Sequence, residues 1–276
     1  MKCTDAIPAR GLRHGSVALL ACLALATTPT RAQPGGADRF DGSARVGTTI
    51  ELARDEVAPG ETVWATIRMD HDDGWHTYWP GRSDTGMGTR ITFTPIEGLS
   101  FGDPIWPTPD RYLAPGDILD HVYDERAEIH VPIRVRDGVD PVQALRIEAR
   151  VNFLVCEAVC LPGEDAVATS LHIVPPEHAD DRASDPPNRH PQLEPSHASW
   201  DGSAVTIRVE DAARYEFSPA MTCSDLENTI RDGAQKGPSC TIRFGDDAEP
   251  RLSGRLRVVH RDGRESHFDV DLTPNP

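Results

Sequence analysis

The chain has 276 residues and a formal net charge of −16, with 38% hydrophobic and 26% charged residues. This composition supports one large packed domain or two small ones and excludes wholesale disorder. The excess of negative charge makes nucleic acid and anionic lipid poor partners, so we expect no nucleic-acid binding.

The first 32 residues have the three parts of a secretory signal peptide. Arg10 and Arg13 precede an apolar run at 16–26, and Thr30 and Ala32 place small residues where a signal peptidase cleaves. The apolar run is too short to span a bilayer as a helix. We therefore expect cleavage near Ala32, no membrane insertion of the mature protein, and an oxidising compartment in which paired cysteines form disulfides.

Alternation of apolar and polar residues predicts β-strands from residue 46 onward, after a polar leader at 33–42. Runs at 46–52 and 63–69 flank a turn at 58–60, which is a hairpin pattern with one buried face. The further predicted strands are 89–94, 128–136, 145–156 and 166–174. With 24 prolines and 22 glycines and no ten-residue stretch of helical period, residues 43–175 are predicted to form an all-β sandwich.

A second, smaller β domain is predicted for residues 199–276. The segment 176–198 is rich in Pro, Asp, His and Ser, has almost nothing apolar, and is typical of a disordered linker. Alternating runs follow it, and Cys223 and Cys240 lie in the irregular middle of this region. We expect them to form a structural disulfide, which would close an 18-residue loop and stabilise the domain by about 3 kcal/mol.

The chemically informative feature is the pair Cys156 and Cys160. An extended chain would separate their Cα atoms by roughly 13 Å, whereas a disulfide requires less than about 7 Å. The pair can close only if the intervening residues turn, and Pro162 with Gly163 just beyond favours a reversal. A hairpin tip that carries a very short disulfide loop is therefore predicted.

The alternation of the incoming strand indicates where Cys156 points. The apolar face of 145–153 is formed by every second residue, and Cys156 falls on the other face, toward solvent or a covering loop. A short, accessible disulfide is the labile kind that exchanges with partner thiolates. Spacing alone leaves redox chemistry, a structural disulfide and metal binding open.

Four segments of the chain occur in the order and spacing of a known family. They are GWHTYWPGRSDTGMGT at 74–89, IWPTPDRY at 105–112, VPI at 131–133 and FLVCEAVCLPG at 153–163. They resemble the N-terminal periplasmic domain of the thiol:disulfide interchange reductase DsbD, and most of all the ScsB branch with its C-x3-C pair. The resemblance covers about residues 45–175. It implies an immunoglobulin-like β-sandwich, followed in the ScsB branch by a second β-sandwich domain.

The resemblance also implies a function and its residues. Cys160 matches the cysteine that forms the mixed disulfide with thioredoxin-fold partners, and Cys156 matches the resolving cysteine. A cap over the active site would correspond to residues 120–124, with His121, Val122 and Tyr123 at its centre, although this segment lacks the family's Gly-Tyr pattern. The family needs no cofactor or metal. We expect a periplasmic module that passes electrons to or from thioredoxin-fold partners, with a separate membrane electron carrier as a further candidate partner.

Two further classes of function remain as alternatives. The alternatives to a disulfide reductase component are a non-enzymatic β module that binds copper or a partner protein, with Cys156 and Cys160 as soft metal ligands, and a structural adaptor with two inert disulfides. Trp75, Trp79 and Trp106 are candidates for a partner surface, but large aromatic residues in β-sandwiches usually fill the core, so all three are predicted to be buried. His76, between Trp75 and Trp79, is expected to be a hydrogen-bonded structural histidine.

Overall fold

The computed structural model describes residues 40–178, 190–245 and 249–274, so the predicted signal peptide and leader up to residue 39 lie outside the described residues. Nearly all regular elements are β-strands, as predicted. Among the described residues the helical elements are short: α1 (Thr229–Asp232) and the 3-10 turns η1 (Gly42–Arg45), η2 (Pro176–His178) and η3 (Pro195–His197).

The first sheet contains the hairpin that the sequence predicts. β1 (Val46–Leu52) pairs antiparallel with β3 (Thr62–His71), and β3 pairs with β9 (Arg126–Val135), which carries β6 (Leu99–Phe101) on its other edge. The intervening turn contains Gly60, whose φ of 86° favours glycine. The strand order is therefore β1-β3-β9-β6.

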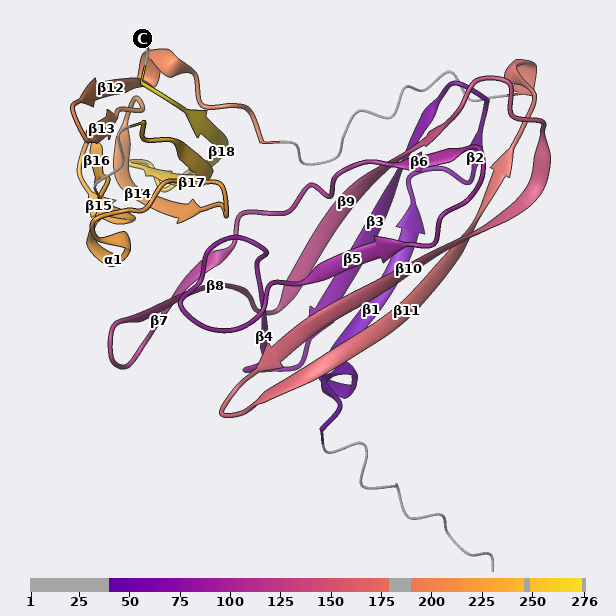
Figure 1. The fold of residues 1–276 in the computed structure, drawn as a ribbon, viewed down its shortest axis with the longest axis horizontal. Coiled ribbons are helices and arrows are strands. Elements are labelled where there is room, and N and C mark those ends of the chain that lie inside the picture. The colour runs from indigo at the N-terminus through magenta and orange to yellow at the C-terminus, as the bar shows by residue number, and fades with distance from the viewer. Residues whose placement is uncertain (1–39, 179–189, 246–248, 275–276) are drawn as a thin grey trace, which may run out of the picture. The chain divides into compact units, whose positions relative to one another are not determined.

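The second sheet is organised around one long hairpin, which Figure 1 shows as two strands running side by side. Its members are β10 (Val142–Cys156) and β11 (Cys160–Ile173). Four short strands complete the order β2-β11-β10-β4-β8-β7, and β5 (Arg90–Phe93) also pairs with β10. They are β2 (Glu56–Val57), β4 (His76–Tyr78), β7 (Asp110–Ala114) and β8 (Ile118–Tyr123).

The core of these two sheets forms from the alternating apolar faces of their strands. Ile67 of β3, Ile129 of β9 and Phe153 of β10 are fully buried in one cluster. Trp75 and Trp79 are buried in the same cluster, as predicted, whereas Trp106 is only partly buried against it. Because two sheets enclose one apolar layer, residues 46–173 form an immunoglobulin-like β-sandwich.

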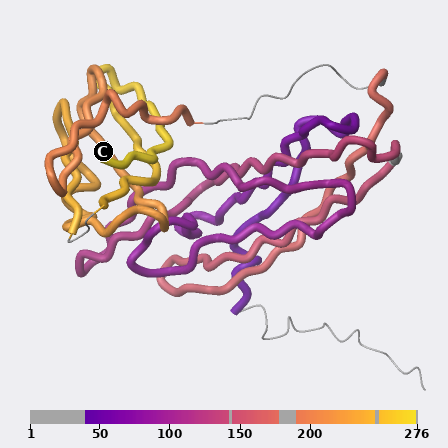
Figure 2. Tube along the Cα trace, turned by 45° about the horizontal axis from the view of Figure 1, so that its top comes forward, coloured from indigo at the N-terminus to yellow at the C-terminus, as the bar shows by residue number. Residues whose placement is uncertain are grey.

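Residues 190–274 contain a separate apolar cluster of their own. One sheet has the order β12-β13-β16 and the other β15-β14-β17-β18, and the orange-to-yellow trace in Figure 2 folds back repeatedly on itself. Tyr215, Phe217 and Ile242 are fully buried in this cluster. The strands are β12 (Ala198–Asp201), β13 (Ala204–Ile207), β14 (Ala212–Pro219), β15 (Ala234–Lys236), β16 (Cys240–Arg243), β17 (Leu252–His260) and β18 (Glu265–Leu272).

The second core begins earlier than the sequence predicts. Leu193 lies within the predicted linker, but it is buried in this core, and its N–H donates to the carbonyl oxygen of Asp269. A single leucine among prolines produces no alternation, so the sequence pattern could not assign it. The start of the second β part therefore moves from residue 199 to about residue 190, and residues 179–189 of the predicted linker lie outside the described part.

Candidate functional site

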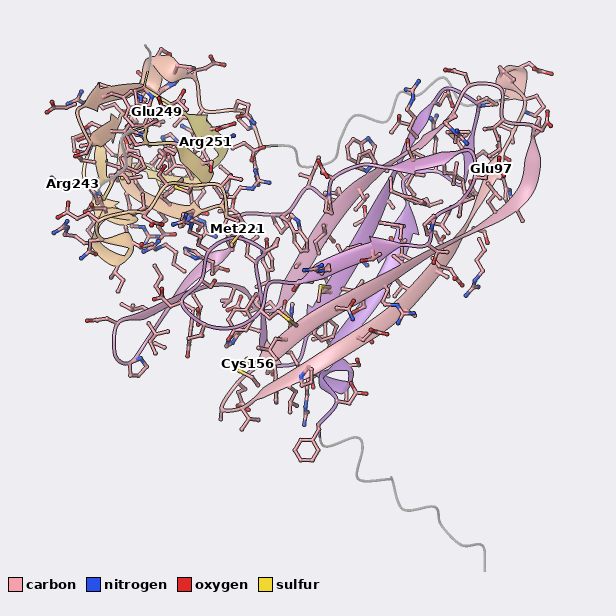
Figure 3. All side chains as sticks on the ribbon, in the orientation of Figure 1. Glu97, Cys156, Met221, Arg243, Glu249 and Arg251 are labelled. Atoms are coloured by element: carbon pink, nitrogen blue, oxygen red, sulfur yellow. A yellow bond between two sulfur atoms is a disulfide. The ribbon has the colours of Figure 1, made fainter. Side chains whose placement is uncertain are left out.

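The disulfide lies at the tip of the β10–β11 hairpin, as predicted. Cys156 and Cys160 are directly paired as the last rung of the ladder, with a Cα–Cα distance of 4.1 Å and a bond between their sulfur atoms. Three residues form the turn, closed by the N–H of Glu157 donating to the carbonyl oxygen of Val159. Figure 3 shows Cys156 at the end of β10, where the hairpin reverses. The reversal brings two cysteines within bonding distance although only three residues separate them.

The two sulfur-bearing residues differ in exposure. Cys160 is exposed, as is Val159 beside it, whereas Cys156 is 2% exposed. Cys156 packs with Tyr78 and Val122, which are themselves buried. An approaching thiol therefore has access to Cys160 and is shielded from Cys156. The sequence prediction that Cys156 points away from the main core, toward a covering element, agrees with this packing.

Tyr78 supplies a polar contact to the buried sulfur. Its hydroxyl group donates a hydrogen bond of 3.2 Å to Sγ of Cys156. Burial raises the pKa of Tyr78, and the nearby carboxylate of Asp120 adds to this increase. The phenol therefore stays protonated at neutral pH and remains a donor. A hydrogen bond to a sulfur favours its thiolate form, since negative charge strengthens the acceptor.

The register of β4 and β8 decides which predicted cap residues face the sulfur. Tyr78 pairs with Val122, and Thr77 pairs with Tyr123. Because side chains alternate along a strand, Val122 lies on the face of Cys156, and His121 and Tyr123 point to the opposite face. The segment predicted as a cap is therefore strand β8, and of its three central residues Val122 contacts Cys156.

His121 is held on the opposite face of β8. Its Nδ1 donates to the carbonyl oxygen of Arg82 at 2.6 Å, and its Nε2 lies 3.5 Å from a guanidinium nitrogen of Arg111. Burial and the nearby charge of Arg111 lower the pKa of His121 to about 4. These contacts fix a neutral ring, so His121 has a structural role in positioning β8.

Tyr123 is likewise part of the packing. It is 4% exposed, its hydroxyl donates to the carbonyl oxygen of Pro107 at 2.8 Å, and its ring stacks on Trp106. Burial raises its pKa well above the usual value. His121 and Tyr123 therefore support the strand that carries Val122, and their contacts among the described residues are with groups other than the disulfide.

His76 lies beside the disulfide on the sulfur's face. It is the direct antiparallel partner of Cys156, and its ring contacts the rings of Tyr78 and Tyr112. Burial lowers the pKa of His76, and the carboxylates of Asp120 and Asp124 oppose that shift. The sequence prediction of a hydrogen-bonded histidine is wrong, since neither ring nitrogen forms a hydrogen bond within the described part of the chain.

The second cysteine pair is chemically different. Cys223 and Cys240 are both buried and are two separate thiols, so the predicted disulfide between them is not formed in the structure. Cys240 lies on β16, where its Sγ donates to the carbonyl oxygen of Asp232 at 3.6 Å. Burial raises the pKa of both thiols, to about 12 for Cys240. Because the thiolate is the reactive form, these buried thiols are inert at neutral pH.

A metal-binding site requires several ligand side chains at close range. Within residues 40–178, 190–245 and 249–274, no cluster of three or more His, Cys, Asp or Glu side chains is arranged to bind one. In the same ranges, no helix combines the length and apolar character needed to cross a membrane.

Comparison with known proteins shows what the first sandwich is similar to. Residues 50–171 match the family model described as thiol:disulfide interchange protein DsbD, N-terminal. These residues are similar to a DsbD N-terminal domain. The match spans β1 to β11 and includes both cysteines of the hairpin tip, which confirms the resemblance drawn from the sequence motifs. No curated protein sequence matches the chain.

One solved structure of a DsbD-related domain shares the fold, and a second is similar to part of the chain. The N-terminal periplasmic domain of ScsB from Proteus mirabilis is 18% identical, with a TM-score of 0.51, and the alignment covers 81% of this chain and 91% of that one. The reduced N-terminal domain of DsbD from Neisseria meningitidis is 15% identical over 49% of this chain and 90% of that chain, with a TM-score of 0.30. The ScsB alignment is long enough to extend beyond residues 50–171 into the second β part.

Proposed function

We propose that this chain is a periplasmic thiol–disulfide exchange module that passes electrons to or from thioredoxin-fold partners through Cys156 and Cys160. The observation that carries this proposal is the hairpin-tip disulfide with one exposed and one buried cysteine. Such asymmetry supports attack by the partner at the exposed sulfur and internal resolution by the buried one. The DsbD N-terminal match and the signal-peptide pattern support the periplasmic location.

Reduction of the module begins at the exposed sulfur. A partner thiolate attacks Sγ of Cys160, the Cys156–Cys160 bond breaks, and Cys156 leaves as a thiolate. The Tyr78 hydroxyl stabilises this leaving group through the hydrogen bond that it already donates. A second partner thiolate then attacks the partner's sulfur in the mixed disulfide. The module ends with two thiols after taking up two electrons and two protons.

The opposite direction uses the same atoms. The Cys160 thiolate attacks the disulfide of an oxidised partner and forms a mixed disulfide. Cys156 then loses its proton and attacks Sγ of Cys160, which restores the internal disulfide and expels the partner's second thiolate. No cofactor enters either sequence, because the electrons stay with sulfur throughout. We further propose that a separate membrane carrier supplies the electrons in the cell.

Single cysteine variants test the proposed roles. With an oxidised thioredoxin-fold protein as the probe, Cys156→Ser should accumulate a mixed disulfide through Cys160, visible as a covalent adduct on non-reducing gels. Cys160→Ser should form no adduct, because the remaining sulfur is buried. Cys223→Ala is the matched control and should exchange as the parent does. Exchange at the parent rate by both hairpin variants would contradict the proposal.

A further inference from the structure

His76 is placed where a proton carrier for the buried sulfur would have to be. It lies directly opposite Cys156 in the antiparallel pair of β4 and β10, and the two side chains share one face of the sheet. Directly opposed residues in such ladders have Cβ atoms about 4.5–5.5 Å apart. An imidazole ring at that separation reaches a neighbouring thiol without any movement of the backbone.

The ring nitrogens of His76 distinguish it from nearby histidines. His71 uses both nitrogens, Nε2 with the hydroxyl of Thr77 at 2.9 Å and Nδ1 with the carbonyl oxygen of Glu125 at 3.4 Å. His121 is similarly held through both nitrogens. For His76 the described residues supply ring contacts but no hydrogen bond to a nitrogen. Its imidazole is therefore free to exchange protons, whereas those of its neighbours are committed to structure.

The surroundings keep this imidazole neutral but able to charge. His76 is 9% exposed and lies against aromatic rings, which disfavours the imidazolium form, while two carboxylates favour it. A base that is neutral at rest and lies near carboxylates can take the proton of a neighbouring thiol and return it. The titratable groups that face it from the elements packed around it are Tyr78 on β4, Tyr112 on β7, Asp120 on β8, Asp124 after β8, Cys156 on β10 and His71 on β3.

We propose that His76 accepts the proton of Cys156 during resolution of the mixed disulfide and returns it when the module is reduced. This inference rests on the proposed function and assigns a further residue to it. In resolution, the imidazole takes the thiol proton, the Cys156 thiolate attacks Sγ of Cys160, and the partner leaves as a thiolate. In reduction, the imidazole takes a proton from water and passes it to the departing Cys156 thiolate, which leaves the ring neutral again.

The aromatic disulfide DTNB separates the two sulfur steps without any protein partner. Attack by Cys160 of the reduced parent releases one equivalent of thionitrobenzoate and leaves a mixed disulfide. Attack by Cys156 then releases the second equivalent, so the rate of the second phase against pH reports how Cys156 loses its proton. We expect His76→Asn to slow the second phase at least tenfold at pH 7 and to shift its pH midpoint upward.

Three comparisons make this test specific. The first phase, which depends on Cys160, should stay at the parent rate, and the two proteins should converge at a pH above the thiol pKa. His71→Asn should retain the parent profile, because that ring is committed to structure. His76→Gln repeats the test with a different non-titrating side chain. An unchanged second phase, or equal slowing of both phases, would overturn the inference.

The proposed function can fail independently of this inference. A parent protein that shows the His76-dependent second phase with DTNB, but no exchange with a thioredoxin-fold protein, would refute the partner assignment and leave the proton role standing. A parent that exchanges with such a protein, while His76→Asn matches it at every pH, would refute the proton role alone.

Discussion

The Tyr78 hydroxyl is the polar group that directly contacts the buried sulfur. Its hydrogen bond to Cys156 is largely shielded from solvent, since both residues are almost fully buried. In such surroundings a donor that is already aligned stabilises developing negative charge more than a solvated donor would. The same contact should matter little while the sulfur is neutral, so its effect should appear mainly in the step that releases the thiolate.

Replacement of Tyr78 by phenylalanine tests this contribution. The ring and its packing are retained and only the donor is lost, so Tyr78→Phe should slow reduction of the disulfide by dithiothreitol. Hydrogen bonds to charged groups contribute about 1.5–3 kcal/mol, which corresponds to roughly a 10- to 100-fold decrease in rate. Tyr112→Phe is the control, since Tyr112 contacts the ring of His76 and is half-exposed. Equal rates for parent and Tyr78→Phe would contradict the assignment.

At the residue scale the sequence identifies the sulfur pair but not its neighbours. Cys156 and Cys160 are close in sequence, so their pairing follows from local chain reversal. Tyr78 and Val122 meet Cys156 only because β4 lies between β10 and β8 in the sheet. β4 has three residues, which is too short for alternation to show which side chains share a face. The same limit led to the wrong expectation for His76.

The β10–β11 hairpin shows that the alternation of apolar and polar residues predicts the existence of strands well but their ends poorly. Alternation predicts both strands, but the structure begins β11 at Cys160 instead of residue 166. Pro162 and Gly163, expected near the reversal, lie within the strand opposite Leu154 and Phe153. Proline is tolerated at this position because β11 pairs with β2 only at its far end, which leaves Pro162 on an edge.

Gly163 is required by the ring of Phe153, which faces it across the hairpin. A Cβ atom at residue 163 would lie 2.3 Å from that ring, which is fully buried in the core. Gly163→Ala should therefore lower the free energy of unfolding by about 1–3 kcal/mol, the usual effect of overpacking. Ser170→Thr adds a methyl group at an exposed position of the same strand and should have little effect. Urea unfolding monitored by circular dichroism measures both, and equal stability of Gly163→Ala and the parent would show that Phe153 moves freely.

For the molecule as a whole, the two apolar clusters imply two sources of stability. The residues 46–173 and 193–272 each supply their own buried set of side chains. The sequence predicts the first sandwich well because its strands are long and alternate. It misplaces the start of the second β part because Leu193 and the residues around Cys223 are buried in irregular segments. In such segments apolar and polar residues do not alternate, so the sequence gives no signal of burial.

A substitution in the second cluster should lower the stability of the protein without changing the redox properties of the hairpin-tip disulfide. Ile242 is fully buried there, so Ile242→Ala should reduce the free energy of unfolding by about 2–5 kcal/mol. The reduction potential of the Cys156–Cys160 pair, measured against glutathione, should remain at the parent value. Ile147→Ala, the same change in the first cluster, is the matched comparison. A shifted potential in Ile242→Ala would show that the second core influences the hairpin tip.

The unequal exposure of the two cysteines also bears on damage by peroxide. In the reduced module an oxidant reaches the exposed Cys160 before the buried Cys156. Oxidation of a thiolate first gives a sulfenic acid, which condenses with a neighbouring thiol to form a disulfide and water. Cys156, held within bonding distance at the last rung of the ladder, captures that intermediate before it reaches the irreversible sulfinic state. The geometry that serves exchange therefore also returns an oxidised cysteine to the state from which the next cycle begins.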